Sequence, residues 1–311
     1  MTLSEAIGKI RKVLRIPLPR LIEKIWIWGL AHSPLAPGLE RILGAQRHEQ
    51  LIRCLSIRYW PNITSPKSFN ENILYRKLFT DKKLFYRVSD KVKVRNYVRK
   101  KVGDKVLNEV FEITNKPKSF CFGDLPSEFV VKSSHGSGQI IIVKEKKGVN
   151  KKEIQNKCEK WLSVNPAKEK REYWYRKKGA QIIFEKILKG KKQEIPRDYK
   201  FFVFDGIVRT IEVDFNRFEG HTRTLYTREW KSLDCSYKFP RGPEVDRPPR
   251  LHEMINIAET LGCEFDFVRV DLFDTRDDGI VFGEMTLAPE TGGGRFEPKS
   301  YDFKIGSYWK R

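Results

Sequence analysis

The stretch FVRVDLFDTRDDGIVFGEMT, residues 267–286, constrains the fold more than any other part of the chain. Apolar and polar residues alternate on both sides of an acidic, glycine-containing loop, which predicts the two strands of a hairpin. A hairpin centred on this loop puts Asp271 opposite Glu284 and Arg269 opposite Thr286, all on one face. Two carboxylates directly across a ladder repel each other. The pair therefore indicates either a site for a hard cation or a plain surface hairpin with solvated charges.

The rest of the pattern mixes helices and strands without a regular βαβ order, which predicts an α+β fold. Helices are expected at 65–79, 89–103, 151–163 and 249–262, with Gly103 and Gly262 as stop signals. Strands are expected at 107–114, 128–146 (with a glycine-serine turn inside), 181–188 and 197–215, the last a hairpin that turns at Asp205-Gly206.

Composition excludes several classes of protein. The 311 residues include 40% hydrophobic residues and no run of about 18 uncharged apolar residues, so a globular chain without a membrane span is expected. The five cysteines are scattered and lack CxxC spacing, which argues against a disulfide framework or a zinc site. The start of the sequence lacks the features of a signal peptide. We therefore expect a cytoplasmic location.

The net charge of +21 favours anionic partners such as nucleic acids, lipid headgroups, nucleotides or acidic polysaccharides. Signatures of nucleic-acid-binding domains are absent from the sequence, so no nucleic-acid partner is expected. Residues 1–16 and 20–32 have the pattern of basic amphipathic helices, the second with two tryptophans. Such helices either lie on the inner face of an anionic membrane or pack on the body of the protein.

A second informative stretch is VVKSSHGSGQ, residues 130–139, in which a strand runs into a glycine-serine loop. Glycines let the backbone approach an anion, and N–H groups with serine hydroxyls can cradle phosphate oxygens. The loop matches neither the Walker pattern nor GxGxxG, and an ordinary turn explains it equally well. His135 is interpreted as a polar group of the loop rather than a catalytic base.

Six motifs occur in an order that resembles the TupA-like branch of the ATP-grasp superfamily: SFNENI, SDKVKVRNYV, FVVKSSHGSG, DYKFFVFDG, VRVDLF and FGEMTLAPETGG. The resemblance runs from about residue 66 to the C-terminus. It implies an ATP-grasp fold in which two α+β subdomains clamp ATP, preceded by N-terminal helices. The expected division is 1–60 for basic helices, 61–125 for the preceding region, 126–190 for the small subdomain and 191–311 for the large subdomain.

The resemblance also implies a set of site residues, with ATP and Mg²⁺ as cofactors. It assigns phosphate contacts to Lys91, to Lys132 and to the glycine-serine loop 136–138. Adenine recognition is assigned to residues 185–188, and a ribose contact to Asp198. The expected ATP-binding residues are Lys91, Lys132, Gly136, Ser137, Gly138, Glu185, Lys186, Ile187, Leu188 and Asp198. The expected metal ligands are Asp271, Glu284 and Thr286, the last in place of an asparagine that the family commonly has.

Further residues are assigned by position and charge. Arg269 lies one pleat from the metal pair and is expected to stabilise charge on the transferring group, and Lys200 faces the same side as Asp198. Substrate contacts are expected on charge alone at Arg217, Arg223 and Arg295. Glycines 292–294 are expected to let the backbone approach the substrate.

The activity that the resemblance implies is ATP-dependent ligation of a carboxylate to an amine through an acyl phosphate. The expected partners are an acidic glycan or its lipid-linked precursor, and an amino acid or other amine, in cell-surface polysaccharide biosynthesis. A glycosyltransferase is an alternative, although the sequence has no DxD and Glu264-Phe265-Asp266 is its nearest approximation. A kinase that stops at phosphoryl transfer would use the same ATP site.

Overall fold

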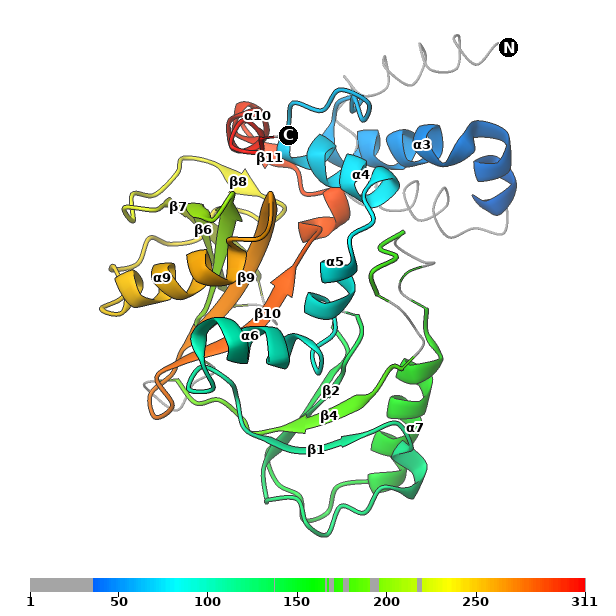
Figure 1. Cartoon of the computed structure of the whole chain (residues 1–311), viewed down its shortest axis with the longest axis vertical. Coiled ribbons are helices and arrows are strands. Elements are labelled where there is room, and N and C mark those ends of the chain that lie inside the picture. Colours follow the sequence, from blue (N-terminus) through cyan, green and yellow to red (C-terminus); the bar gives the residue numbers. More distant parts are fainter. Residues whose placement is uncertain are drawn as a thin grey trace.

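The computed structural model describes residues 36–136, 138–165, 167, 171–175, 179–190, 196–216 and 220–310. Two antiparallel sheets form the body (Figure 1). The small sheet has the strand order β1-β4-β2-β3, and the large sheet has the order β10-β9-β5-β6-β7. The expected α+β class is confirmed. The predicted helices 1–16 and 20–32 lie outside the described residues.

The strands are β1 (Val110–Thr114), β2 (Phe129–Ser133), β3 (Ile140–Val143), β4 (Ile182–Glu185), β5 (Asp198–Phe204), β6 (Ile207–Phe215), β7 (Thr222–Thr227), β8 (Ser236–Tyr237), β9 (Phe267–Asp274), β10 (Ile280–Thr286) and β11 (Phe296–Glu297). The helices are α3 (Ala36–Ile57), α4 (Phe69–Phe79), α5 (Lys83–Val88), α6 (Val94–Val102), α7 (Lys151–Ser163), α9 (Leu251–Gly262) and α10 (Ser300–Gly306), with short 3₁₀ turns η1 (Pro117–Ser119) and η2 (Pro289–Gly292).

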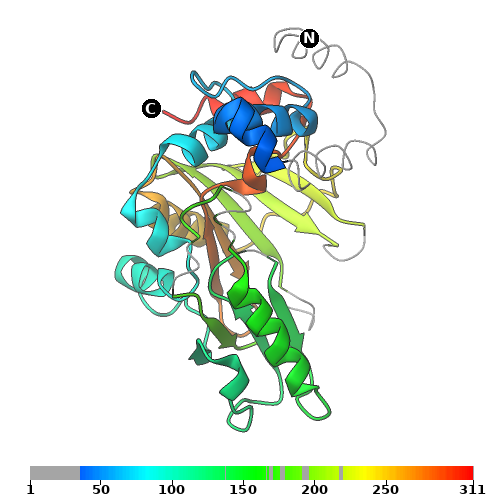
Figure 2. The same ribbon diagram turned by 90° about the vertical axis from the view of Figure 1, so that its right-hand side faces the viewer.

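The small sheet and α7 form one subdomain with its own apolar core. The side chain of Asn150 accepts a hydrogen bond from the backbone N–H of Glu153 and caps α7, which has the predicted bounds. Ile154 and Cys158 of α7 are buried in that core, and Figure 2 shows the helix lying along the sheet. Strand β1 pairs with β4, so this sheet includes a strand from the segment expected to precede the small subdomain.

The large sheet packs one face on α9. Alternate residues of β5 and β9, among them Val203 and Val270, are fully buried there. Gly262 belongs to this interface and is the last residue of α9, where the sequence predicts the helix to end, but it does not adopt the left-handed conformation of a glycine stop. A Cβ on Gly262 would lie 2.5 Å from Val203 Cγ1, which shows that the glycine is required by close packing of helix on strand.

The predicted hairpins are present. β5 and β6 turn at Asp205 (φ 47°) and Gly206 (φ 76°), where both residues adopt the left-handed conformation that tight hairpin turns need. In β9 and β10, Asp271 pairs with Glu284 and Arg269 with Thr286, as the alternation predicts.

The helices at the N-terminal side pack on the end of the large sheet. α4 begins after Ser68, whose hydroxyl and the side chain of Glu71 form a capping box. Phe69 then packs against aromatic rings of β5, β9 and the C-terminal segment, including Phe202 and Trp309. α3 is broken at Gly44 (φ 75°, ψ 157°) and is tied to α4 by an ion pair between Glu49 and the buried Lys77. Within the described ranges, no helix is both long enough and apolar enough to cross a membrane.

Candidate active site

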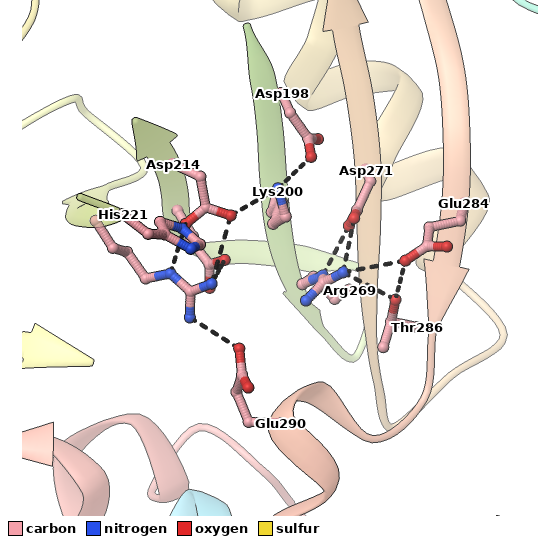
Figure 3. Close-up of polar contacts among 11 residues, drawn as sticks. Asp198, Lys200, Asp214, His221, Arg269, Asp271, Glu284, Thr286 and Glu290 are labelled. Atoms are coloured by element: carbon pink, nitrogen blue, oxygen red, sulfur yellow. Dashed lines mark hydrogen bonds and ion pairs between the residues drawn. The ribbon is translucent and has the colours of Figure 1, made fainter. Parts of the chain in front are cut away.

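The large-sheet face that turns away from α9 carries a charged side chain in every strand (Figure 3). The antiparallel register sets these residues side by side, because Lys200 pairs with Asp271 on one side and with Glu212 on the other. Burying charges is costly unless they are paired. The residues of this charged face are Asp198, Lys200, Glu212, Asp214, Arg223, Arg269, Asp271 and Glu284.

Arg269 lies between the two opposed carboxylates. Its Nε and Nη2 each donate to a carboxylate oxygen of Asp271 at 2.7 Å, and Nη2 also donates to Glu284 Oε1 at 3.3 Å and Thr286 Oγ1 at 3.0 Å (Figure 3). The opposed carboxylates thus have a cationic partner within the protein itself, whether or not a metal ion is bound. The guanidinium offsets their repulsion within the protein itself.

The two carboxylates differ in their electrostatic surroundings. Burial raises the pKa of Asp271 to about 7, against the opposing effect of Arg269. Glu284 has a lowered pKa, because Lys91 and Arg269 together outweigh the effect of burial. Its side chain is 37% exposed, whereas that of Asp271 is 5% exposed. Glu284 is thus the accessible, ionised member of the pair.

The donor set at this pair fits Mg²⁺, which takes oxygen ligands from one or two carboxylates together with substrate phosphates. Asp271, Glu284 and Thr286 would be the protein ligands. Both oxygens of Asp271 accept hydrogen bonds from Arg269, so a cation and the guanidinium compete for the same atoms. In the part of the chain that the structure describes, no group of three or more His, Cys, Asp or Glu side chains could hold a metal ion.

Lys200 is buried in the middle of the charged face. Its Nζ forms ion pairs with Asp198 and, at 3.2 Å, with Asp214. Burial alone would lower the pKa of Lys200, but the surrounding carboxylates of Asp198, Asp271 and Asp214 raise it. Lys200 is therefore a permanent positive charge, and Asp198 lies against it at the start of β5. The expected ribose contact of Asp198 stays a prediction.

A pocket between the two sheets contains both lysines that were expected to contact phosphates. It is lined by Lys91, Arg95, Asn108, Lys132, Glu185, Leu188, Phe273, Phe282 and Gly283. Lys132 Nζ donates to Glu185 Oε2 at 2.7 Å. Lys91 Nζ lies 4.0 Å from Glu284 Oε2, and burial lowers the pKa of Lys91. The pocket thus adjoins the Asp271–Glu284 pair.

The glycine-serine loop is attached to the segment that carries Lys91. The backbone N–H of Lys91 donates to Ser134 O at 2.8 Å, and its Nζ donates to Gly136 O at 2.8 Å. Gly136 (φ 100°) and Gly138 (φ 77°) adopt a conformation that favours glycine, which explains their place in the motif. Ser137 lies outside the described residues. His135 is buried, and its Nε2 lies 3.3 Å from Val164 O.

The strand expected to recognise adenine runs from β4 into the link between the subdomains. The backbone N–H of Lys186 donates to Glu109 O at 3.0 Å, and the Asn108 amide donates to Lys186 O at 2.9 Å. In the described ranges, no backbone hydrogen bond is formed by Ile187 or Leu188. Adenine recognition by this strand stays a prediction.

The arginines expected to bind substrate are engaged within the protein. Arg223 forms ion pairs with Asp214, Glu212 and Glu290, and is 3% exposed. Arg295 pairs with Glu297 near β11. The Arg223 guanidinium is thus not available to a polyanion as it stands, whereas the Arg295 side chain is 39% exposed and its substrate contact stays a prediction. Arg217 lies outside the described residues.

Two of the glycines expected to approach the substrate are required by packing within the protein. A Cβ at Gly292 would lie 2.7 Å from Leu74 Cδ2, and a Cβ at Gly294 would overlap the ring of Tyr237. The substrate contact expected of glycines 292–294 stays a prediction.

The sequence reasoning missed four residues around these groups: Arg95 and Asn108 in the pocket, and Glu212 and Asp214 in β6. The stretch IEVDF alternates as clearly as the β9 sequence does, so the signal for the last two was present. Glu290 gave no such signal, because it follows the strand and meets Arg223 only through the tertiary fold.

Two α+β subdomains that enclose lysines on one side and a carboxylate pair with an arginine on the other define a nucleotide-binding protein of the ATP-grasp type. The model of the TupA-like ATP-grasp family matches residues 71–310. The chain belongs to that family.

Solved structures to which this chain is similar include those of two ligases and a synthetase. D-alanine–D-alanine ligase from Bacillus anthracis complexed with ATP is 17% identical, with a TM-score of 0.42 over 71% of this chain and 63% of that one. The ADP complex of N5-carboxyaminoimidazole ribonucleotide synthetase is 12% identical, with a TM-score of 0.42 over 79% and 57%. The ATP-grasp ligase PsnB complexed with minimal precursor is 13% identical, with a TM-score of 0.36 over 83% and 68%. This chain spans less than two thirds of the length of the D-alanine–D-alanine ligase and of the ribonucleotide synthetase. Among curated proteins, no sequence matches it.

Proposed function

We propose that this protein is an ATP-dependent ligase that joins a carboxylate of an acidic glycan, or of its lipid-linked precursor, to an amine during cell-surface polysaccharide biosynthesis. One observation carries the proposal: Lys91 Nζ lies 4.0 Å from Glu284 Oε2. This contact brings the two lysines of the pocket together with Arg269 and the carboxylate pair. A phosphoryl group held there would have positive charge on both sides.

In this proposal the lysines and Arg269 bind anionic groups of the substrates, and the carboxylates bind the metal ion. Lys91 and Lys132 suit the phosphate oxygens of ATP, with the Lys132–Glu185 ion pair opening as the nucleotide enters. Mg²⁺ held by Asp271 and Glu284 would neutralise phosphate charge. Arg269, released from Asp271 in that state, would donate to the oxygens of the acyl group.

The proposed reaction balances in two steps. A carboxylate oxygen of the glycan attacks the γ-phosphorus, the bond to the β-phosphate oxygen breaks, and ADP leaves. The amine nitrogen then attacks the acyl carbon, the carbon–oxygen bond to phosphate breaks, and an amide and inorganic phosphate form. An ammonium substrate loses two protons in all, one to the phosphate and one to solvent. The net charge of +21 supports an anionic glycan as the first substrate.

The test is an assay of ADP and phosphate release with Mg·ATP, a panel of uronic acids and their oligomers, and a panel of amino acids. Release that needs both a carboxylate and an amine supports the ligase, and hydroxylamine in place of the amine should trap a hydroxamate. Release of UDP from a sugar nucleotide without ATP consumption would establish the glycosyltransferase instead. ADP formation with a phosphorylated sugar and no free phosphate would establish the kinase.

We also propose that the basic segment of residues 1–32 attaches the protein to an anionic membrane surface. The support is the sequence pattern of basic residues beside tryptophans. A chain lacking residues 1–32 should keep ATP binding and lose sedimentation with phosphatidylglycerol vesicles, as should the whole chain at high salt. If the truncated chain is unfolded, the segment is structural and the membrane role fails.

A further inference from the structure

A second group of charged side chains lies at the β6–β7 end of the charged face. Arg223 is at its centre, with Nε 2.7 Å from Asp214 Oδ1, Nη2 2.9 Å from Glu212 Oε1 and Nη1 3.1 Å from Glu290 Oε1. These four residues are named here the Arg223 cluster. One guanidinium faces three carboxylates, so the cluster has too little positive charge of its own.

Neighbouring cations do not make up the difference. Lys200 reaches Asp214 at 3.2 Å, but it is shared with Asp198. His221 Nε2 lies 3.0 Å from Asp214 Oδ1 and adds a positive charge only when the imidazole is protonated. Three carboxylates of the cluster thus share one guanidinium of their own and one ammonium group that Asp198 also engages.

Two fully buried polar groups at the cluster have unused hydrogen-bonding capacity. Glu212 contacts Arg223 through Oε1 in the ion pair at 2.9 Å, whereas its Oε2 and the hydroxyl of Tyr237 have no hydrogen-bond partner among the residues that the structure describes. Both side chains are 0% exposed. The Tyr237 ring centre lies 5.2 Å from the Arg223 guanidinium. Burial raises the pKa of the Tyr237 hydroxyl, and the nearby carboxylates of Glu290 and Glu212 raise it further. Buried polar groups are normally satisfied, so this arrangement is suited to a bound polar group.

We propose that the Arg223 cluster, with Tyr237, binds the ammonium group of the amine substrate. This inference rests on the proposed ligase function and deepens it. Carboxylates supply the charge, the Tyr237 hydroxyl supplies an acceptor, and an anionic glycan is repelled. The side chains of Glu290 and His221 are 21% and 18% exposed, so the amine can enter between them.

The position of the cluster suits the second half of the reaction. Glu212 pairs with Lys200 and Lys200 pairs with Asp271, so two strand spacings, about 10 Å, separate the cluster from the carboxylate pair. An amine held there lies on the same sheet face as the groups proposed to bind the phosphates. The two substrates are thereby sorted by charge along one surface.

The test compares wild type with Glu290→Gln, which keeps the side-chain size and removes one negative charge. The control is Glu253→Gln, a solvent-exposed position on α9. With galacturonate as the carboxylate and L-alanine, L-lysine or ethanolamine as the amine, Glu290→Gln should raise the KM for the amine about ten-fold and leave the KM for ATP unchanged. Hydroxylamine is uncharged at neutral pH, so the rate of hydroxamate formation should not change.

Binding provides a readout that does not depend on turnover. Titration calorimetry with L-lysine should give affinity about ten-fold weaker in Glu290→Gln than in wild type or in the control, and Tyr237→Phe should also weaken it. If wild type and Glu290→Gln turn over with the same KM for the amine, the amine subsite is wrong and the proposed ligase function is still supported. Absence of any amine-dependent ADP release, with lysine binding still weakened by Glu290→Gln, would overturn the ligase and leave the cation site. If wild type and Glu290→Gln bind L-lysine equally well, or if wild type does not bind it, the amine subsite is wrong.

Discussion

Replacing Gly262 by alanine should destabilise the protein, although alanine is the better helix former. A Cβ at this position lies 2.5 Å from Val203 Cγ1 and 2.8 Å from Val203 Cβ, well inside van der Waals contact. Val203 is 0% exposed in the middle of the large sheet, so it has no free space to move into. Overpacking of this kind costs about 1–3 kcal/mol, and the gain in helix propensity is about 0.5–1 kcal/mol. We expect a net loss of about 1–2 kcal/mol, since the steric cost outweighs the propensity.

Urea unfolding followed by tryptophan fluorescence measures this change. Gly38→Ala in α3 is the matched control, because no heavy atom lies within 4 Å of its added Cβ and it should stabilise by about 0.5–1 kcal/mol. Adding Val203→Ala to the Gly262→Ala protein should recover part of the steric cost, so the two changes should cost less together than their sum. The explanation fails if Gly262→Ala and Gly38→Ala shift the unfolding midpoint in the same direction.

Three further predictions concern the site and the pH dependence. Lys132→Ala should weaken ATP binding by about 1.5–3 kcal/mol in calorimetry, and unchanged affinity would remove this residue from the phosphate site. Asp271→Asn should abolish Mg²⁺-dependent turnover with an unchanged circular dichroism spectrum, and normal turnover at limiting Mg²⁺ would contradict the metal assignment. Burial raises the pKa of Asp302 to about 6, so stability present below about pH 4 should be lost as the pH rises through 6. Asp302→Asn should lack this part of the pH dependence of the unfolding free energy. Parallel pH profiles for wild type and Asp302→Asn would show that Asp302 is not its cause.

The paired strands and their facing residues could be predicted because the side chains of a strand alternate strictly. The alternation places Arg269 with Asp271, and Glu284 with Thr286, on one face, and the pairing is as predicted although a bulge shifts the register between Phe282 and Glu284. It could not show that Arg269 forms its hydrogen bonds with Asp271, since side-chain rotamers depend on all the neighbours of the final fold. The opposed carboxylates were correctly singled out, but their partner within the protein was not.

Glycine was the residue whose role the sequence identified least well. A helix stop and a close helix–strand contact look alike in sequence, and only the position of Val203 distinguishes them at Gly262. The same applies to Gly292 and Gly294, whose close contacts with Leu74 of α4 and with Tyr237 gave no signal in the sequence. The partners of Arg223 could not be predicted for a related reason, because two of the three carboxylates are on a neighbouring strand and the third is 67 residues away.

The two faces of the large sheet lie in different environments, one packed on α9 and the other lined by charged side chains. In β5, odd-numbered positions such as Val203 face α9, and even-numbered positions such as Lys200 face the charged side. A mutational scan along residues 198–201 of β5 should therefore alternate between loss of turnover at Asp198 and Lys200 and loss of expression at Tyr199 and Phe201. Phe202 and Phe204 lie on the same face as Lys200 but pack on Phe69, so expression should fall there as well. Deleting a single residue from the middle of β5 would exchange the two sets, placing lysine and aspartate against the helix. These strands can accept substitutions, but they cannot accept a change of length.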